Sequence, residues 1–84
     1  MRLTTYESEV LESIWRLKYY HLMQPRMYQV AADTGLAVRI VQNSVNSLEG
    51  SGVVTRKYEP RVIKSLWPLE ITARGTLVLD NMPY

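Results

Sequence analysis

Five polar side chains close together in the sequence have the chemistry to read base pairs. They comprise one guanidinium, three amides and one hydroxyl, with no acid among them: Arg39, Gln42, Asn43, Asn46 and Ser47. An amide can both donate to and accept from the adenine edge in the major groove, and an arginine can donate twice to guanine. Their spacing of three and four residues places them on one face of a helix. The pattern predicts a base-reading helix face.

The opposite face of this segment is apolar or small, as a packed helix requires. Val41, Ser44, Val45 and Leu48 recur at intervals of three and four, and such a stripe faces a protein core. We therefore expect a recognition helix over residues 37–49. It begins at alanine rather than at a serine or threonine, so its first amides lack a side-chain partner.

A shorter helix and a tight turn are expected just before the recognition helix. Residues 28–34 include small side chains that allow a second helix to cross closely. Gly35 follows, and glycine readily takes the left-handed conformation that closes a helix. Leu36 would then fill the turn as its apolar plug. The two helices would then meet at a tight turn, and the second would have the right width for the major groove.

A basic hairpin, the wing, is expected over residues 53–71. Residues 53–58 are rich in β-branched and aromatic types and favour a strand. A second strand is expected over 62–71, with Ile63, Trp67, Leu69 and Ile71 on one side. Pro68 must mark an edge, a bulge or a break in it because it lacks an amide proton. Side chains near the tip could hold DNA phosphates: Arg56, Lys57, Tyr58, Arg61 and Lys64.

Charge is concentrated in this half of the chain. The net charge is only +2, but residues 38–64 hold five Lys and Arg against two Glu, which gives +3 and leaves −1 for the remainder. One interpretation is phosphate binding; the other is a solvated hairpin whose cations discourage edge-to-edge aggregation. The position of the wing beside an amide-rich helix favours the first.

Two further helices flank these elements. Thr4 and Glu7 have the spacing of a reciprocal capping pair, which begins a first helix that should end before Pro25. Thr72 is placed to cap a last short helix from Ala73 to about Asn81. The apolar stripe of the first helix is formed by Val10, Leu11, Ile14, Leu17 and Leu22.

Taken in order, these motifs resemble the winged helix-turn-helix of transcription regulators, especially MarR-like and PadR-like repressors. The resemblance implies an α+β winged helix, with a three-helix helix-turn-helix core, a two-stranded β wing and a short C-terminal helix in a single domain over residues 1–84. It also implies a repressor that binds double-stranded DNA as a homodimer. The matching pieces are Val30-Ala31, Gly35-Leu36, the Val41, Val45 and Leu48 spacing, Leu48-Glu49-Gly50-Ser51-Gly52-Val53-Val54, and Ile71-Thr72-Ala73-Arg74-Gly75.

Other classes of function have weaker support. The chain has no cysteine and a single histidine, and it shows no glycine-rich phosphate loop, so we expect no enzyme activity, catalytic residue, metal or cofactor. It shows no leader peptide and no apolar stretch long enough to cross a bilayer, so we expect a cytoplasmic protein without a membrane partner.

Three questions stay open at this level. Val38 and Ile40 could touch thymine methyls, could be packed, or could bind another protein, and the last option gives an alternative function as a winged-helix interaction module. A small-molecule pocket between the first helix and the wing, lined by Trp15 or Trp67, is possible. A homodimer would have to use the first helix, the last helix or both, because MarR-like proteins dimerise through long terminal helices that this chain has no length for.

Overall fold

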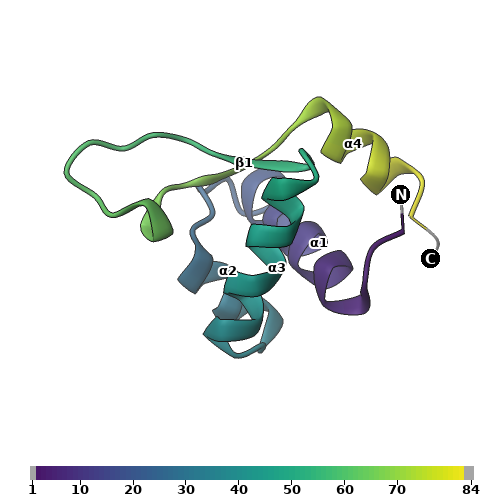
Figure 1. The fold of residues 1–84 in the computed structure, drawn as a ribbon, viewed down its shortest axis with the longest axis horizontal. Coiled ribbons are helices and arrows are strands. Elements are labelled where there is room, and N and C mark those ends of the chain that lie inside the picture. Colours follow the sequence, from purple (N-terminus) through teal and green to yellow (C-terminus); the bar gives the residue numbers. More distant parts are fainter. Residues whose placement is uncertain (1, 83–84) are drawn as a thin grey trace.

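Three helices pack together and support a two-stranded sheet and a fourth helix (Figure 1). The computed structural model describes residues 2–82. Its elements are α1 (Thr5–Tyr19), α2 (Met27–Thr34), α3 (Val38–Gly50), β1 (Val54–Arg56), the short 3-10 helix η1 (Lys64–Leu66), β2 (Leu69–Ile71) and α4 (Ala73–Asp80). The order confirms the expected α+β fold, in a layout consistent with a winged helix.

Helix α1 begins at the expected capping pair. The Glu7 amide donates to Thr4 Oγ1 over 3.1 Å, and the Thr4 amide donates to Glu7 Oε1 over 2.9 Å. The stripe is buried from Val10 to Leu17, but its expected last member is wrong. Leu22 lies beyond the helix end in a left-handed conformation (φ 54°) and is 86% exposed, because the chain turns there toward α2.

The turn between α2 and α3 forms as expected. Gly35 has φ 75° and its amide donates to the carbonyl of Ala31 over 2.9 Å, which closes α2 in the left-handed conformation. Leu36 is half-buried against the core. Helix α3 buries the expected stripe and starts at Ala37 without a side-chain cap, as its sequence predicts.

The wing contains much less strand than expected. Strands β1 and β2 are antiparallel and pair Val54 with Ile71 and Arg56 with Leu69. A strand over 62–71 is wrong except for its last three residues. The Lys57 amide still donates to the Pro68 carbonyl over 2.9 Å, but proline has no amide to continue the ladder.

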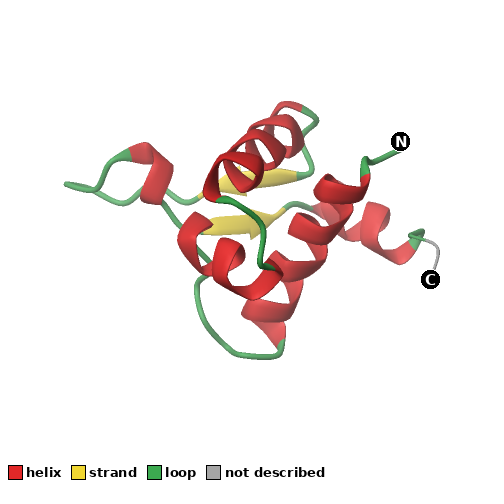
Figure 2. Ribbon diagram, turned by 90° about the horizontal axis from the view of Figure 1, so that it is seen from below, coloured by secondary structure: helices red, strands yellow, loops and turns green. Residues whose placement is uncertain are grey.

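The chain before Pro68 forms η1 and a long loop instead of a strand. Ile63 is exposed, and Trp67 is half-buried with its indole N–H donating to the Val62 carbonyl over 2.7 Å. Neither side chain lies on the strand face expected from the alternation. The two strands run side by side, while the loop joining them extends away from the helices (Figure 2).

Hydrogen bonds join both ends of the sheet to neighbouring segments, and its side chains Val54 and Leu69 lie in the core. The Leu69 amide donates to the Pro25 carbonyl over 2.7 Å, so the segment that enters α2 lies along β2. At the other end, the Thr72 amide donates to the Val53 carbonyl over 3.1 Å, and the Gly75 amide donates to Thr72 Oγ1 over 3.0 Å and caps α4 as expected. A Cβ at Gly75 would lie 2.2 Å from the Val53 carbonyl oxygen. The junction therefore requires glycine.

Candidate nucleic-acid interface

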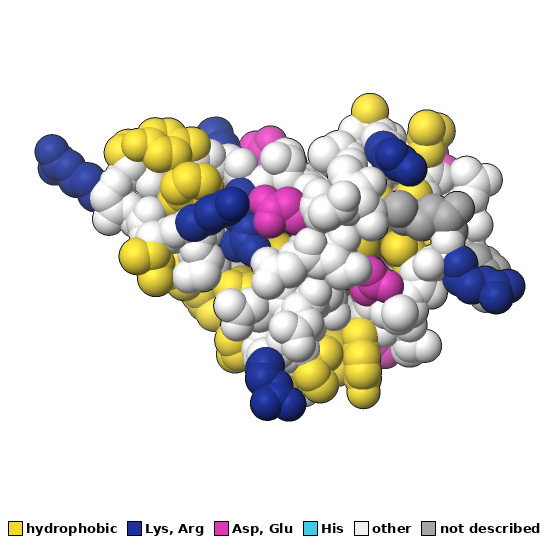
Figure 3. Space-filling model, viewed as in Figure 1, with side chains coloured by type: hydrophobic (Ala, Val, Ile, Leu, Met, Phe, Trp, Pro, Cys, Tyr) yellow, Lys and Arg dark blue, Asp and Glu magenta, His cyan; other side chains and the backbone are white. Residues whose placement is uncertain are grey.

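All five expected base-reading side chains lie exposed on α3, on the side opposite its buried stripe: Arg39, Gln42, Asn43, Asn46 and Ser47. The surface over α3 is mostly uncharged, with both basic and acidic side chains near its edges (Figure 3). Helical spacing thus gives the arrangement that the sequence predicts.

The five side chains differ in whether they already make hydrogen bonds within the protein. Within residues 2–82, Arg39, Gln42 and Asn43 have no side-chain hydrogen bond. Asn46 Oδ1 accepts a hydrogen bond of 3.1 Å from Arg56, and Ser47 Oγ donates to Glu7 Oε2. Since its only proton is committed to Glu7, the Ser47 hydroxyl can offer an incoming ligand just an acceptor.

Arg56 is placed differently from the phosphate contact expected of it. Its side chain is only 5% exposed, with Nε 3.3 Å from Glu49 Oε1. Its two terminal nitrogens donate to Asn46 Oδ1 over 3.1 Å and to the Lys64 carbonyl over 3.2 Å. Arg56 lies on a strand that packs beside α3, so its guanidinium joins α3 to the wing rather than pointing to solvent.

The other four wing side chains are exposed: Lys57, Tyr58, Arg61 and Lys64. Tyr58 packs edge-to-face on Trp67, with ring centroids 5.1 Å apart. Arg61 lies in the turn at the tip with φ 66°. Because Arg56 contacts both Asn46 and the Lys64 carbonyl, η1 of the wing is a neighbour of the exposed face of α3.

The two acids of this surface are matched by ion pairs. Glu49 pairs with Arg56, and Glu59 pairs with Arg26 over 2.8 Å. Both acids of residues 38–64 are therefore matched by cations. Among the cations of residues 38–64, four are exposed and have no ion-pair partner in the described part of the chain: Arg39, Lys57, Arg61 and Lys64.

Sequence reasoning missed Arg26, which fixes the wing to the entry of α2. Besides pairing with Glu59, it donates to the Leu66 carbonyl over 2.7 Å. Both partners are distant in the sequence and no local pattern connects them, so only the folded chain shows this contact.

Glu7 was expected only as part of a helix cap, but it also contacts α3. Its hydrogen bond from Ser47 and then that from the Thr4 amide hold the pKa of this carboxyl below its ordinary value of 4.5. Glu7 also lines a shallow depression between the start of α1 and α3, together with Tyr6, Ile40 and Asn43. An acid therefore borders the face expected to read bases.

Val38 and Ile40 lie at the start of α3. Val38 is 55% exposed, and Ile40 is half-buried on the wall of the depression beside Glu7. Packing therefore does not account for Val38. Its side chain is available to a thymine methyl or to an apolar side chain of a partner protein.

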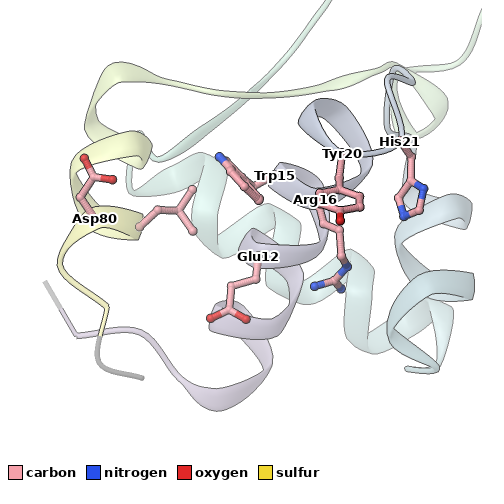
Figure 4. Close-up of a pocket in the computed structure, with 7 residues that line it drawn as sticks. Glu12, Trp15, Arg16, Tyr20, His21 and Asp80 are labelled. Atoms are coloured by element: carbon pink, nitrogen blue, oxygen red, sulfur yellow. The ribbon is translucent and has the colours of Figure 1, made fainter.

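A larger groove of about 480 Å³ lies between α1 and α4, not between α1 and the wing. In Figure 4, Trp15 lies between Asp80 on one side and Arg16 and Tyr20 on the other. Trp67 is not among its lining residues, which also include Glu12, His21 and Leu79. The groove is mainly apolar and is bordered by the two helices expected to form a dimer.

Other kinds of site find no support in residues 2–82. None of the helices there is both long enough and apolar enough to cross a membrane. The same residues contain no group of three or more acidic, histidine or cysteine side chains that could hold a metal ion. Comparison of the chain with protein-family models and with curated proteins finds no match.

Proposed function

We propose that this protein is a sequence-specific, double-stranded DNA-binding transcriptional regulator, a cytoplasmic repressor of the MarR-like and PadR-like winged-helix kind. One observation carries the proposal. Arg56 joins the exposed amide face of α3 to η1 of the wing, so base-reading side chains and unpaired cations occupy neighbouring elements.

Each part of this surface suits one component of DNA. A helix fits the major groove, where Gln42 and Asn43 can bind adenine and Arg39 can bind guanine. Lys57, Arg61 and Lys64 would hold phosphates along the backbone or beside the minor groove. The Tyr58 hydroxyl can add a phosphate hydrogen bond.

A homodimer on a two-fold site accompanies this proposal. Trp15 and Tyr19 on α1 are exposed apolar side chains, and Trp15 lines the groove of Figure 4 between α1 and α4. Leu77 on α4 is also exposed and lines a second depression, with Leu3 and Met82. A second copy docked over both hollows would cover these side chains and would present two α3 helices to half-sites about one helical turn of DNA apart.

The test is a titration of the protein into fluorescent duplexes of random sequence, with anisotropy measured at several salt concentrations. Lys57→Gln should weaken binding to all sequences alike and lower the salt slope by about 1. Asn43→Ala should cost about 1 to 3 kcal/mol and relax preference at one base pair. No anisotropy change at low salt would exclude DNA binding by this surface.

The exposed Val38 supports one alternative, a winged-helix module that binds another protein. Val38 lies at the start of α3 with Ile40, which lines a shallow depression together with Tyr6 of α1. A stoichiometric protein partner that is lost in Val38→Ser, together with no retention on DNA in moderate salt, would favour this alternative.

A further inference from the structure

Asn43 and Asn46 are the same residue type on the exposed side of α3, yet their amides differ in freedom. Within residues 2–82 the Asn43 side chain has no hydrogen-bond partner, whereas Asn46 Oδ1 accepts from Arg56 Nη2 over 3.1 Å. A guanidinium has donors only, so the atom facing Arg56 must be the amide oxygen. The two N–H groups of Asn46 have no partner within residues 2–82, and its oxygen keeps one further lone pair.

Arg56 is held firmly enough to keep this orientation. Its side chain is 5% exposed, its Nε lies 3.3 Å from Glu49 Oε1, and its Nη1 donates to the Lys64 carbonyl over 3.2 Å. If the Asn46 amide turned its oxygen toward DNA, a buried guanidinium N–H would lose its acceptor. Leaving such a donor unpaired is costly, particularly on a charged group.

We propose that Arg56 orients the Asn46 amide so that its N–H groups are the main contact offered to DNA, and that α3 therefore selects guanine over adenine at the base pair facing Asn46. This inference rests on the proposed DNA-binding function. Guanine presents two acceptors, O6 and N7, in the major groove, whereas adenine presents the N6 donor beside the N7 acceptor. The N–H groups of Asn46 match the guanine edge.

Adenine is disfavoured because its amino group would have to share the Asn46 oxygen with the Arg56 guanidinium, whose positive charge repels the amino hydrogens. Asn43 has both its oxygen and its nitrogen free and keeps the usual asparagine preference for adenine. Arg56 is thus a positioning residue that makes two chemically identical side chains read different bases.

The first experiment measures base preference. The base pair read by each asparagine is the one whose preference disappears in Asn46→Ala or Asn43→Ala, and all four bases are then tested there. At the Asn46 pair we expect the unmodified protein to bind guanine about tenfold tighter than adenine. Arg56→Met should reduce this ratio severalfold and leave the Asn43 pair unchanged. Asn46→Asp, which keeps the Arg56 contact but has no N–H, should abolish the guanine preference.

The second experiment needs no DNA. Side-chain ¹⁵N relaxation of the free protein should show a rigid Asn46 amide and a mobile Asn43 amide, and Arg56→Met should make them alike. Equal mobility in the unmodified protein would overturn the inference, even if Arg56→Met fails to fold. An adenine preference at the Asn46 pair would also overturn it. A rigid Asn46 in a protein that binds no duplex would instead overturn the proposed function, and base selection with it.

Discussion

Glu7 shows how one side chain can serve two elements. Its two carboxylate oxygens have different partners, the Thr4 amide at the start of α1 and the Ser47 hydroxyl on α3. Local spacing reveals the first partner, because capping pairs are three residues apart. The second depends on how α1 and α3 cross, which no local pattern records.

The lowered pKa of Glu7 predicts a dependence of stability on pH. A carboxyl whose pKa is lower in the folded state stabilises the protein above its ordinary value of 4.5, and this contribution is lost as the pH falls through the folded value. Glu7→Gln should therefore reduce the free energy of unfolding at neutral pH, and the difference should shrink in acid. Urea denaturation over a pH series measures it.

Glu9→Gln is the charge-matched control for this effect. Glu9 lies on the same helix and, within the described residues, its side chain has no hydrogen bond. If the two variants lose equal stability at neutral pH, the contacts of Glu7 with Thr4 and Ser47 contribute nothing beyond helix charge.

Gly75, at the junction between β2 and α4, is more tightly packed than the other three glycines of this fold. A Cβ at Gly75 would overlap the Val53 carbonyl oxygen at 2.2 Å and the Ile71 Cγ2 at 2.7 Å, whereas one at Gly50 would meet nothing within 4 Å. Backbone cannot move aside as easily as the end of a flexible side chain. The last helix can therefore lie this close to the sheet only if residue 75 has no side chain.

Gly75→Ala should destabilise the protein by about 1 to 3 kcal/mol through overpacking. Gly50→Ala is the matched control and should leave stability unchanged or raise it by up to ~1 kcal/mol, since alanine is the better helix former. Urea denaturation of both variants separates the two effects. Equal stabilities would show that α4 shifts freely to make room at residue 75.

The helices were predictable because their signals are local. Thr4 with Glu7, Gly35, and the stripe that includes Val41 and Val45 specify helix ends and buried faces within a few residues. The second strand was predicted too long. Side chains before Pro68 alternate as they do in a strand, but whether a segment becomes a strand depends on pairing with another segment distant in the sequence. The candidate nucleic-acid interface was likewise predictable only where its signals are local. Exposure on α3 followed from periodicity, whereas the burial of Arg56 depends on contacts between elements.

The molecule as a whole divides its surface between two roles. Four exposed cations without ion-pair partners lie on α3 and the wing, with Arg2 and Arg74 elsewhere, while the exposed Trp15 lines the groove of Figure 4 between α1 and α4. Such a division suits a protein that would bind a polyanion with one surface and a second copy with the other.

Leu77→Glu should prevent the proposed dimer from forming, because it puts a charge into an apolar interface. Sedimentation should then show a monomer where the unmodified protein shows a dimer, and affinity for a two-fold DNA site should fall. Ile63→Glu is a fair control, since Ile63 on the wing is exposed to a similar degree, 67% against 63% for Leu77. If both variants have the same mass as the unmodified protein, α4 does not form the interface.

Arg26 holds the wing in one conformation, which the charges of the wing alone would not do. A long loop carrying several cations would ordinarily fluctuate, and part of the favourable energy of binding would be spent in restricting that motion. Here one guanidinium holds the Glu59 carboxylate and the Leu66 carbonyl, while the Leu69 amide holds the Pro25 carbonyl. The loop is therefore preorganised on the same segment that leads into α2. In the proposed complex, little conformational entropy would remain to be lost when the wing meets DNA.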